Sequence, residues 1–398
     1  MAGEHLPEDI IVKILSNLPV KSLIRFRCVS KRWLSIVADP QFARLQFKVA
    51  CEQQTLSRRF LFSSRATDQF ESLDLELTSF EANSSIRKLD FPFPAHSYVS
   101  LLCSCNGLVC VGLDRGESFY IWNPSIGFIH RLPDPCFSSE RRIWYYGFGY
   151  VSATDDYKLF VGVAADLVEV VQMFSLRARH WKKIDADPLY WNPVQRGVLL
   201  NETLHWLNWV ARDYADLDSD GEDDGEPVLI AFDLAREEFW TNPVPFAAGE
   251  HKYRDAELGV SCDGCLHVIC SPHRESLVSV EFWVMREYGK DDSWTKLYNL
   301  KSCNPPKQIR SLIPILVMQT CAIVMMRTDS GLEWVRIDHH EEKLGETSKV
   351  AATDSVPWIR YRMTGYEESL FWISDYLGVE ETTVASNTRP HKAEIGEG

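Results

Sequence analysis

Residues 6–15 read LPEDIIVKIL, residues 18–23 read LPVKSL and residues 27–33 read RCVSKRW, and together they decide the fold of the N-terminal part of the chain. Pro7 suits the first turn of a helix, because its missing N–H would have no partner there in any case. Pro19 ends that helix and begins a second, shorter one.

Two further helical starts follow in the same stretch. Ser30 is a good N-cap for a third helix that carries Trp33. Asp39-Pro40 closes this helix and starts a last helical turn. The sequence therefore predicts a compact, all-helical module at residues 1–47.

The apolar residues of the first helix form a broad stripe. Positions 10, 11, 14, 15 and 18 are Ile or Leu, which is the spacing of one helical face, and we expect this stripe to be buried. A unit of about 40 residues seldom buries enough apolar surface to fold unaided. Either the rest of the chain or another protein must therefore cover part of the module, and composition alone does not choose between them.

The quoted strings resemble the F-box of plant proteins over nearly the whole motif. F-box proteins use this element to bind the Skp adaptor of cullin-RING ubiquitin ligases, so the resemblance implies a Skp-type adaptor and a cullin as partners. It also implies that eleven residues bind the adaptor or form the core of the module, two roles that the sequence does not separate. These residues are Leu6, Pro7, Ile10, Ile14, Leu15, Leu18, Pro19, Leu23, Cys28, Val29 and Trp33.

The implied ligase role depends on an apolar face that the chain itself leaves open. If the β-rich body enclosed Leu15 and Leu18 and left no apolar surface for another protein, the role would be rejected. Residues 1–47 carry seven Lys and Arg against four Asp and Glu, in a chain of net charge −14. This local excess of positive charge suits either an acidic partner or a solvated surface.

Length and composition limit the classes of protein to which the chain can belong. A chain of 398 residues with 45% apolar residues has enough material for a small module and a large second domain. We expect no membrane partner, because the chain has neither a signal-peptide core nor a stretch of about 20 apolar residues. We expect no nucleic-acid partner, because no cluster of Lys and Arg follows the first module. Eleven cysteines without a disulfide-like spacing indicate a reducing compartment, the cytoplasm or the nucleus.

From about residue 58 the pattern changes to short alternating strands separated by Gly, Asn, Asp and Pro. An apolar strand, a polar turn and an aromatic second strand recur together at intervals of just over 50 residues. These repeats start at Ile121, Met173, Ile230, Phe282 and Trp334. Such a period in an all-β chain is typical of four-stranded propeller blades of the kelch type.

We therefore expect an α+β multidomain fold. It consists of the small all-α F-box at residues 1–47, an all-β kelch-like propeller at residues 58–374 and a polar, flexible tail at residues 375–398. About six blades are expected, with five and seven as the alternatives. Residues 58–91 together with residues 355–373 are predicted to build one of them.

Several strings between residues 98 and 300 are similar to the F-box-associated domain of plant F-box proteins. They are CNGLVC at 105–110, IWNPS at 121–125, GFGY at 147–150, DDYK at 155–158, LHW at 204–206 and WVMREYG at 283–289. Together with the F-box they imply the substrate-recognition subunit of an SCF (Skp–cullin–F-box) E3 ubiquitin ligase. Such a subunit binds a client protein, here unknown, and has no catalytic residue of its own. The alternatives are a non-degradative F-box scaffold and, less favoured, a β-propeller enzyme.

Two further patterns predict no dedicated site. The acidic stretch 213–226 holds eight carboxylates and is typical of a solvated surface loop, although binding of a partner or a cation by this loop stays open. Cys262 and Cys265 form a lone Cys-x-x-Cys without a second pair nearby, so a hairpin turn at Asp263-Gly264 is expected in place of a zinc site. No metal and no cofactor is expected.

Overall fold

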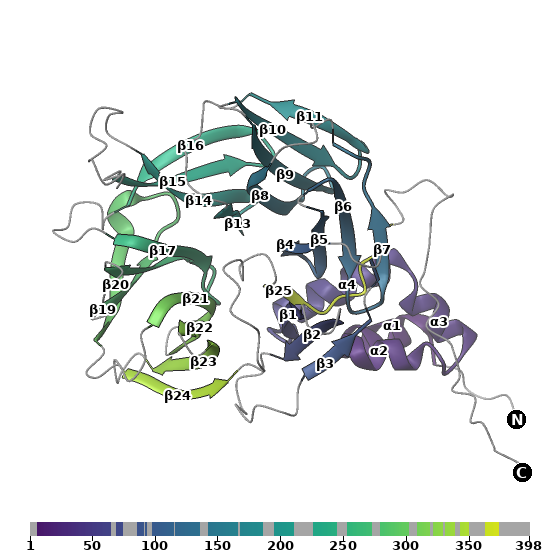
Figure 1. The fold of residues 1–398 in the computed structure, drawn as a ribbon. Coiled ribbons are helices and arrows are strands. Elements are labelled where there is room, and N and C mark those ends of the chain that lie inside the picture. The colour runs from purple at the N-terminus through teal and green to yellow at the C-terminus, as the bar shows by residue number, and fades with distance from the viewer. Residues whose placement is uncertain are drawn as a thin grey trace, which may run out of the picture.

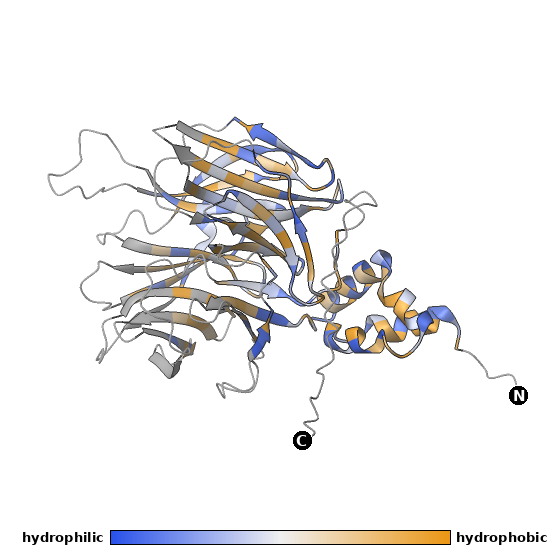
Figure 2. Cartoon of the chain, turned by 45° about the vertical axis from the view of Figure 1, so that its right-hand side comes forward, coloured by the Kyte–Doolittle hydropathy of each residue, from blue (hydrophilic) through white to orange (hydrophobic). Residues whose placement is uncertain are grey.

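The computed structural model of the chain describes residues 6–64, 69–74, 86–90, 92–93, 98–114, 116–135, 142–165, 168–185, 195–210, 226–244, 253–272, 279–301, 309–318, 321–328, 331–338, 343–349 and 363–373. The expected tail at 375–398 and residues 213–225 of the acidic stretch lie outside the described residues. The helices form a lobe beside a ring of β-sheets (Figures 1 and 2). We call these two parts the helical module and the β ring.

The helical module begins and ends its helices where the sequence predicts. The helices are α1 (Glu8–Ser16), α2 (Val20–Phe26), α3 (Lys31–Val37) and α4 (Pro40–Glu52). Pro7 and Pro19 precede the first two, and the Trp33 N–H donates to the Ser30 hydroxyl at 3.1 Å to cap the third. None of the helices in the described part of the chain combines the length and the hydropathy needed to cross a bilayer.

The last helix is longer than the single turn that the sequence predicts. α4 continues to Glu52, past residue 47. It continues because Ala43, Gln46 and Ala50 extend the buried face that Phe42 begins, at helical spacing.

The described strands form six sheets. The first sheet has the order β25 (Met363–Glu367), β1 (Arg58–Ser64), β2 (Gln69–Asp74) and β3 (Ile86–Leu89). The second has the order β4 (Val99–Cys105), β5 (Leu108–Leu113), β6 (Ser118–Asn123) and β7 (Phe128–Arg131). The third has the order β11 (His180–Ile184), β10 (Val168–Ser175), β9 (Asp156–Ala165), β8 (Arg142–Val151) and β12 (Gln195–Arg196).

The other three sheets follow in chain order. The fourth consists of β13 (Val198–Leu200), β14 (Thr203–Val210), β15 (Glu226–Asp233) and β16 (Glu238–Pro243). The fifth consists of β17 (Tyr253–Val260), β18 (Leu266–Pro272), β19 (Ser279–Met285) and β20 (Trp294–Lys301), with the short 3₁₀ turn η2 (Asp291–Ser293) before its last strand. The sixth consists of β21 (Ile309–Val317), β22 (Cys321–Thr328), β23 (Gly331–Asp338) and β24 (Lys343–Lys349).

Five of these sheets have the four antiparallel strands of a propeller blade, whereas the third has a fifth strand that pairs in parallel. Helices followed by a propeller are confirmed, but the expectation of about six blades is wrong: the described strands form five four-stranded blades, because the third sheet carries an additional parallel strand. Here residues 195–196 run along β8 before the chain enters the fourth sheet. The Gly197 N–H donates to the Tyr146 carbonyl at 2.6 Å, which supports the parallel pairing of Arg196 with Tyr146.

The two ends of the ring meet in the first sheet. β25, from the end of the described chain, pairs antiparallel with β1, as predicted for residues 58–91 and 355–373. β25 also packs against β4, and β4 packs against β8 (Figure 1). On the other side, Phe60 and Phe62 share an apolar cluster with Ile323 and Met325 of the sixth sheet. The ring is therefore closed by residues that are far apart in the sequence.

Neighbouring sheets approach closely at the GFGY string. A Cβ added at Gly147 would lie 2.5 Å from a methyl of Leu204, and one at Gly149 would lie 2.5 Å from a methyl of Leu234. Only glycine leaves room for these leucines, which belong to the next sheet and its turn. The two glycines of the GFGY string therefore allow the third and fourth sheets to pack closely together.

Candidate functional site

The core of the helical module is built from apolar residues of all four helices and from two residues of the β ring. Leu15 and Leu23 are fully buried in it, together with Phe42. Leu370, which follows β25, is part of the same cluster, and Ile126 of the β6–β7 turn packs against it. The β ring thus covers part of the apolar surface of the helical module.

A second set of apolar side chains in the module stays exposed. Leu6, Ile10, Ile14 and Val29 have exposed fractions of 57%, 39%, 50% and 61%. We call these four residues the apolar face. The chain by itself therefore buries only part of the stripe of the first helix: Leu15 is buried, whereas Ile10 and Ile14 stay exposed.

The apolar face is contributed by α1, by the residue Leu6 before it and by the α2–α3 connection. Ile10 and Ile14 are four residues apart in α1 and therefore lie on one side of it, and Leu6 lies just before this helix. The Arg32 guanidinium donates to the Leu6 carbonyl at 3.4 Å and lies 3.5 Å from the Glu8 carboxylate, so the start of α3 lies beside the start of α1. Val29 is three residues before Arg32, in the α2–α3 connection.

The eleven residues singled out in the sequence thus separate into groups that the sequence could not distinguish. Leu15 and Leu23 are buried, and Leu18 and Trp33 are half-buried. The exposed ones are Leu6, Pro7, Ile10, Ile14, Pro19, Cys28 and Val29. The condition for rejecting the ligase role is not met, because an apolar surface remains although Leu15 is enclosed.

Basic side chains are also exposed on the helical module. Lys13, Lys21, Arg25, Lys31 and Arg32 are all exposed on α1, α2 and α3. Their charge favours association with an acidic partner and opposes association with another basic surface.

The helical module is joined to the β ring by specific contacts of α4. Arg44 pairs with Asp155 in the β8–β9 turn at 3.1 Å, and the Tyr150 hydroxyl donates to the same carboxylate at 2.8 Å. Burial and this carboxylate raise the pKa of Tyr150 to about 12, so the hydroxyl keeps its proton at neutral pH. The ring of Phe47 meets the ring of Phe371 edge-on, with centroids 5.2 Å apart.

The Cys-x-x-Cys lies in the turn between β17 and β18, with Gly264 at a φ of +78°. The predicted hairpin turn is confirmed. Arg58 donates to the Cys262 sulfur at 3.1 Å, and burial raises the pKa of both thiols. Within the described ranges, no group of three or more His, Cys, Asp or Glu side chains is placed to hold a metal ion.

Comparison with known proteins agrees with this arrangement. The family model described as "F-box domain" matches residues 4–45, and the one described as "F-box associated beta propeller domain" matches residues 60–373. An F-box/kelch-repeat protein of Arabidopsis thaliana is 29% identical over 308 residues, which cover 74% of this chain and 79% of the relative. The F-box protein CPR1 of Arabidopsis thaliana is 29% identical over 340 residues, covering 77% of this chain and 75% of the relative.

Among solved structures, AztD of Citrobacter koseri is similar with a TM-score of 0.42 and 10% identity, over 75% of this chain and 83% of the other. A similarity of this size carries no functional argument. The family models, by contrast, match both parts of the molecule in order. The chain therefore belongs to the F-box proteins that carry an F-box associated beta propeller domain.

Proposed function

We propose that this chain is the substrate-recognition subunit of an SCF E3 ubiquitin ligase. The observation that carries the proposal is the apolar face of the F-box, which stays exposed although the core beneath it is complete. Exposed clusters of large apolar side chains on soluble proteins mark binding surfaces more often than chance. An F-box domain implies that the partner at this surface is a Skp-type adaptor.

In this proposal the apolar face is the centre of the interface and the basic residues are its rim. Ile10 and Ile14 supply apolar contacts from α1, and Val29 supplies them from the α2–α3 connection. The exposed lysines and arginines speed association with an acidic adaptor and contribute less to its final affinity.

The β ring then holds the client protein. Binding the client and the adaptor on one rigid body keeps the client close to the ubiquitin-loaded enzyme, which raises its effective concentration there. The chain itself supplies no nucleophile, acid or base in this scheme. Ubiquitination would direct the client to the proteasome, in the cytoplasm or the nucleus.

The adaptor interface can be tested with one substitution and one matched control. Ile14→Asp places a charge in the apolar face, whereas Leu45→Asp changes a leucine of α4 that is 40% exposed and lies outside the predicted set. Both full-length variants are titrated with a purified Skp-type adaptor by calorimetry. We expect Ile14→Asp to weaken binding by roughly 30-fold or more and Leu45→Asp to leave it nearly unchanged. Equal binding by the unchanged chain and Ile14→Asp would contradict the proposal.

The degradative role needs a separate experiment. The unchanged chain and Ile14→Asp are purified from plant tissue with and without a proteasome inhibitor. Client proteins should accompany both chains, while the adaptor and cullin should accompany only the unchanged one. Clients should also accumulate when the proteasome is inhibited. Unaltered client levels would favour the non-degradative scaffold instead.

A further inference from the structure

The segment that follows β25 connects the F-box to the propeller. We call residues 368–373 the C-terminal strap. It lies beside the β6–β7 turn of the second sheet and helix α4, and its residues contact both the propeller and the F-box.

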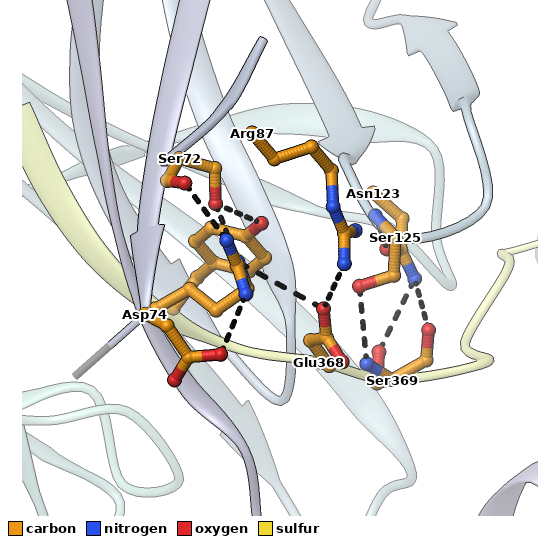
Figure 3. Close-up of polar contacts among 9 residues, drawn as sticks. Ser72, Asp74, Arg87, Asn123, Ser125, Glu368 and Ser369 are labelled. Atoms are coloured by element: carbon orange, nitrogen blue, oxygen red, sulfur yellow. Dashed lines mark hydrogen bonds and ion pairs between the residues drawn. The ribbon is translucent and has the colours of Figure 1, made fainter. Parts of the chain in front are cut away.

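One side chain of the second sheet holds the backbone of the strap. The amide nitrogen of Asn123 donates to the Ser369 carbonyl at 3.1 Å, the Ser369 hydroxyl at 3.2 Å and the Phe371 carbonyl at 2.8 Å. Asn123 is fully buried, and its oxygen accepts the Ser125 N–H at 2.9 Å. The Ser125 hydroxyl in turn accepts the Ser369 N–H at 3.4 Å (Figure 3). Asn123 and Ser125 of the second sheet therefore hold the strap through the main-chain groups of the strap.

The first sheet holds the start of the strap by charge. The Glu368 carboxylate, nearly fully buried, lies 3.2 Å from Arg87 and 3.8 Å from Arg59 (Figure 3). The Glu368 N–H donates at 2.8 Å to the carbonyl of Ser57, which lies just before β1. The strap is thus tied to the linker between the F-box and the propeller.

The remaining side chains of the strap contact both domains. Leu370 is 6% exposed and belongs to the F-box core that contains Leu15 and Leu23. Phe371 meets Phe47 of α4. Ile373 is buried in the apolar cluster shared by the second and third sheets. A displacement of the strap therefore removes contacts from the F-box core and from the propeller together.

We propose that the C-terminal strap couples closure of the propeller to completion of the F-box core. The helices that carry the apolar face reach their full rigidity only when β25 has paired with β1 and has carried Leu370 into place. A chain with an open propeller would then present a loosened F-box. This coupling stands on contacts within the chain, and only its use in adaptor binding rests on the proposed function.

Hydrogen exchange of the full-length chain tests the coupling without any adaptor. Asn123→Asp keeps the oxygen that accepts the Ser125 N–H but removes the N–H groups that donate to the Ser369 and Phe371 carbonyls, and Asn123 is not part of the F-box. Leu370→Ala removes the contact with the F-box core directly. Leu207→Ala is the matched control, because Leu207 is equally well buried in the propeller but belongs to the cluster of the fourth and fifth sheets.

We expect the amides of α1, α2 and α4 to exchange roughly tenfold faster in Asn123→Asp and in Leu370→Ala. In Leu207→Ala those amides should keep their rates, while β14 and β17 exchange faster. Because coupling is reciprocal, Leu15→Ala in the F-box should also accelerate exchange in residues 368–373. Unchanged exchange of the helices in Asn123→Asp would overturn the proposal, as would equal acceleration in Leu207→Ala.

A titration with the Skp-type adaptor tests whether this coupling changes the affinity for the adaptor. The apparent affinity falls with the fraction of chains whose F-box is complete, so Asn123→Asp should bind several-fold more weakly than the unchanged chain. If the unchanged chain binds no adaptor, the proposed function fails, while the exchange result still decides the coupling. If the adaptor binds both chains equally although the helices exchange faster, the gating of adaptor binding is rejected.

Discussion

The F-box and the propeller differ in what they do with large apolar side chains. Of the seven such side chains exposed in the described residues, six lie in the first 45 residues, and Tyr288 is the one in the propeller. The propeller closes its sheets on one another and buries its apolar residues within the chain. The F-box buries one side of its helices and leaves the other side open. Substitutions in the propeller should therefore change mainly stability, and substitutions on the apolar face should change mainly binding.

The largest loss of stability is expected for Phe160→Ala. Phe160 is fully buried in β9, and its ring centroid lies 5.0 Å from those of Trp206 and Phe232 in the fourth sheet. Its removal leaves a cavity between two sheets and should cost about 4 kcal/mol of unfolding free energy. Denaturant unfolding followed by tryptophan fluorescence measures the change. A loss below about 1 kcal/mol would show that the propeller core rearranges easily and would weaken the contrast between the domains.

A somewhat smaller loss is expected for Glu368→Ala in the strap. The substitution leaves the Arg59 guanidinium, whose side chain is 5% exposed, with one carboxylate partner fewer. Removing one member of a buried ion pair should cost about 3 kcal/mol. Glu287→Ala is the control, because the Glu287–Lys290 pair is exposed on both sides and should contribute little. Similar unfolding midpoints for the two variants would show that the buried ion pairs of Glu368 do not hold the strap to the first sheet.

Acid should destabilise the propeller through two buried histidines. Burial lowers the pKa of His205 and of His267 to about 4, against an ordinary value of 6.5. The unfolded chain therefore binds protons at these sites between pH 6.5 and pH 4, while the folded chain does not. Their contribution to stability is complete above about pH 6.5 and is lost as the pH falls toward 4. The thermal midpoint should fall by several degrees between pH 7.5 and pH 5.

His267→Phe separates this effect from the other titrations of the chain. Neither ring nitrogen of His267 has a hydrogen-bond partner among the described residues, so the substitution removes a titrating group without leaving a donor unpaired. In His267→Phe the thermal unfolding midpoint should depend less steeply on pH than in the unchanged chain. An unchanged slope would show that His267 does not carry the acid sensitivity.

The smallest change of stability is expected on the apolar face. Ile14 is half exposed at the surface of α1, so Ile14→Asp should change the unfolding free energy by no more than about 0.5 kcal/mol while it abolishes most adaptor binding. Thermal unfolding without adaptor measures this. A loss comparable to that of Phe160→Ala would mean that Ile14 belongs to the core, and the contrast between the two domains would fail.

Much of the fold follows from local sequence signals. Pro7, Ser30 and Asp39 mark helix starts because they satisfy or avoid the unpaired N–H groups of a first turn. The prediction that residues 58–91 and 355–373 share one sheet rests on the number of strands, because residues 58–91 alone are too few for the four strands of a blade.

Local signals could not predict which apolar residues of the F-box are buried and which are exposed. Ile10 and Ile11 are neighbours in one helical stripe, and periodicity does not reveal which side the other helices cover. Leu15 and Leu370 belong to one apolar cluster although they are 355 positions apart, and no local pattern encodes such a distance. The parallel strand β12 was missed because two residues are too few to show an alternation.

The pairing of β25 with β1 also has a consequence for synthesis of the protein. β1 leaves the ribosome early, and one of its edges stays unpaired until about 300 further residues have been added, which takes roughly 15–60 s at ordinary translation rates. An open strand edge is a template for pairing with other nascent chains. Productive synthesis of this protein should therefore depend on chaperones that shield β1 until the last strand arrives.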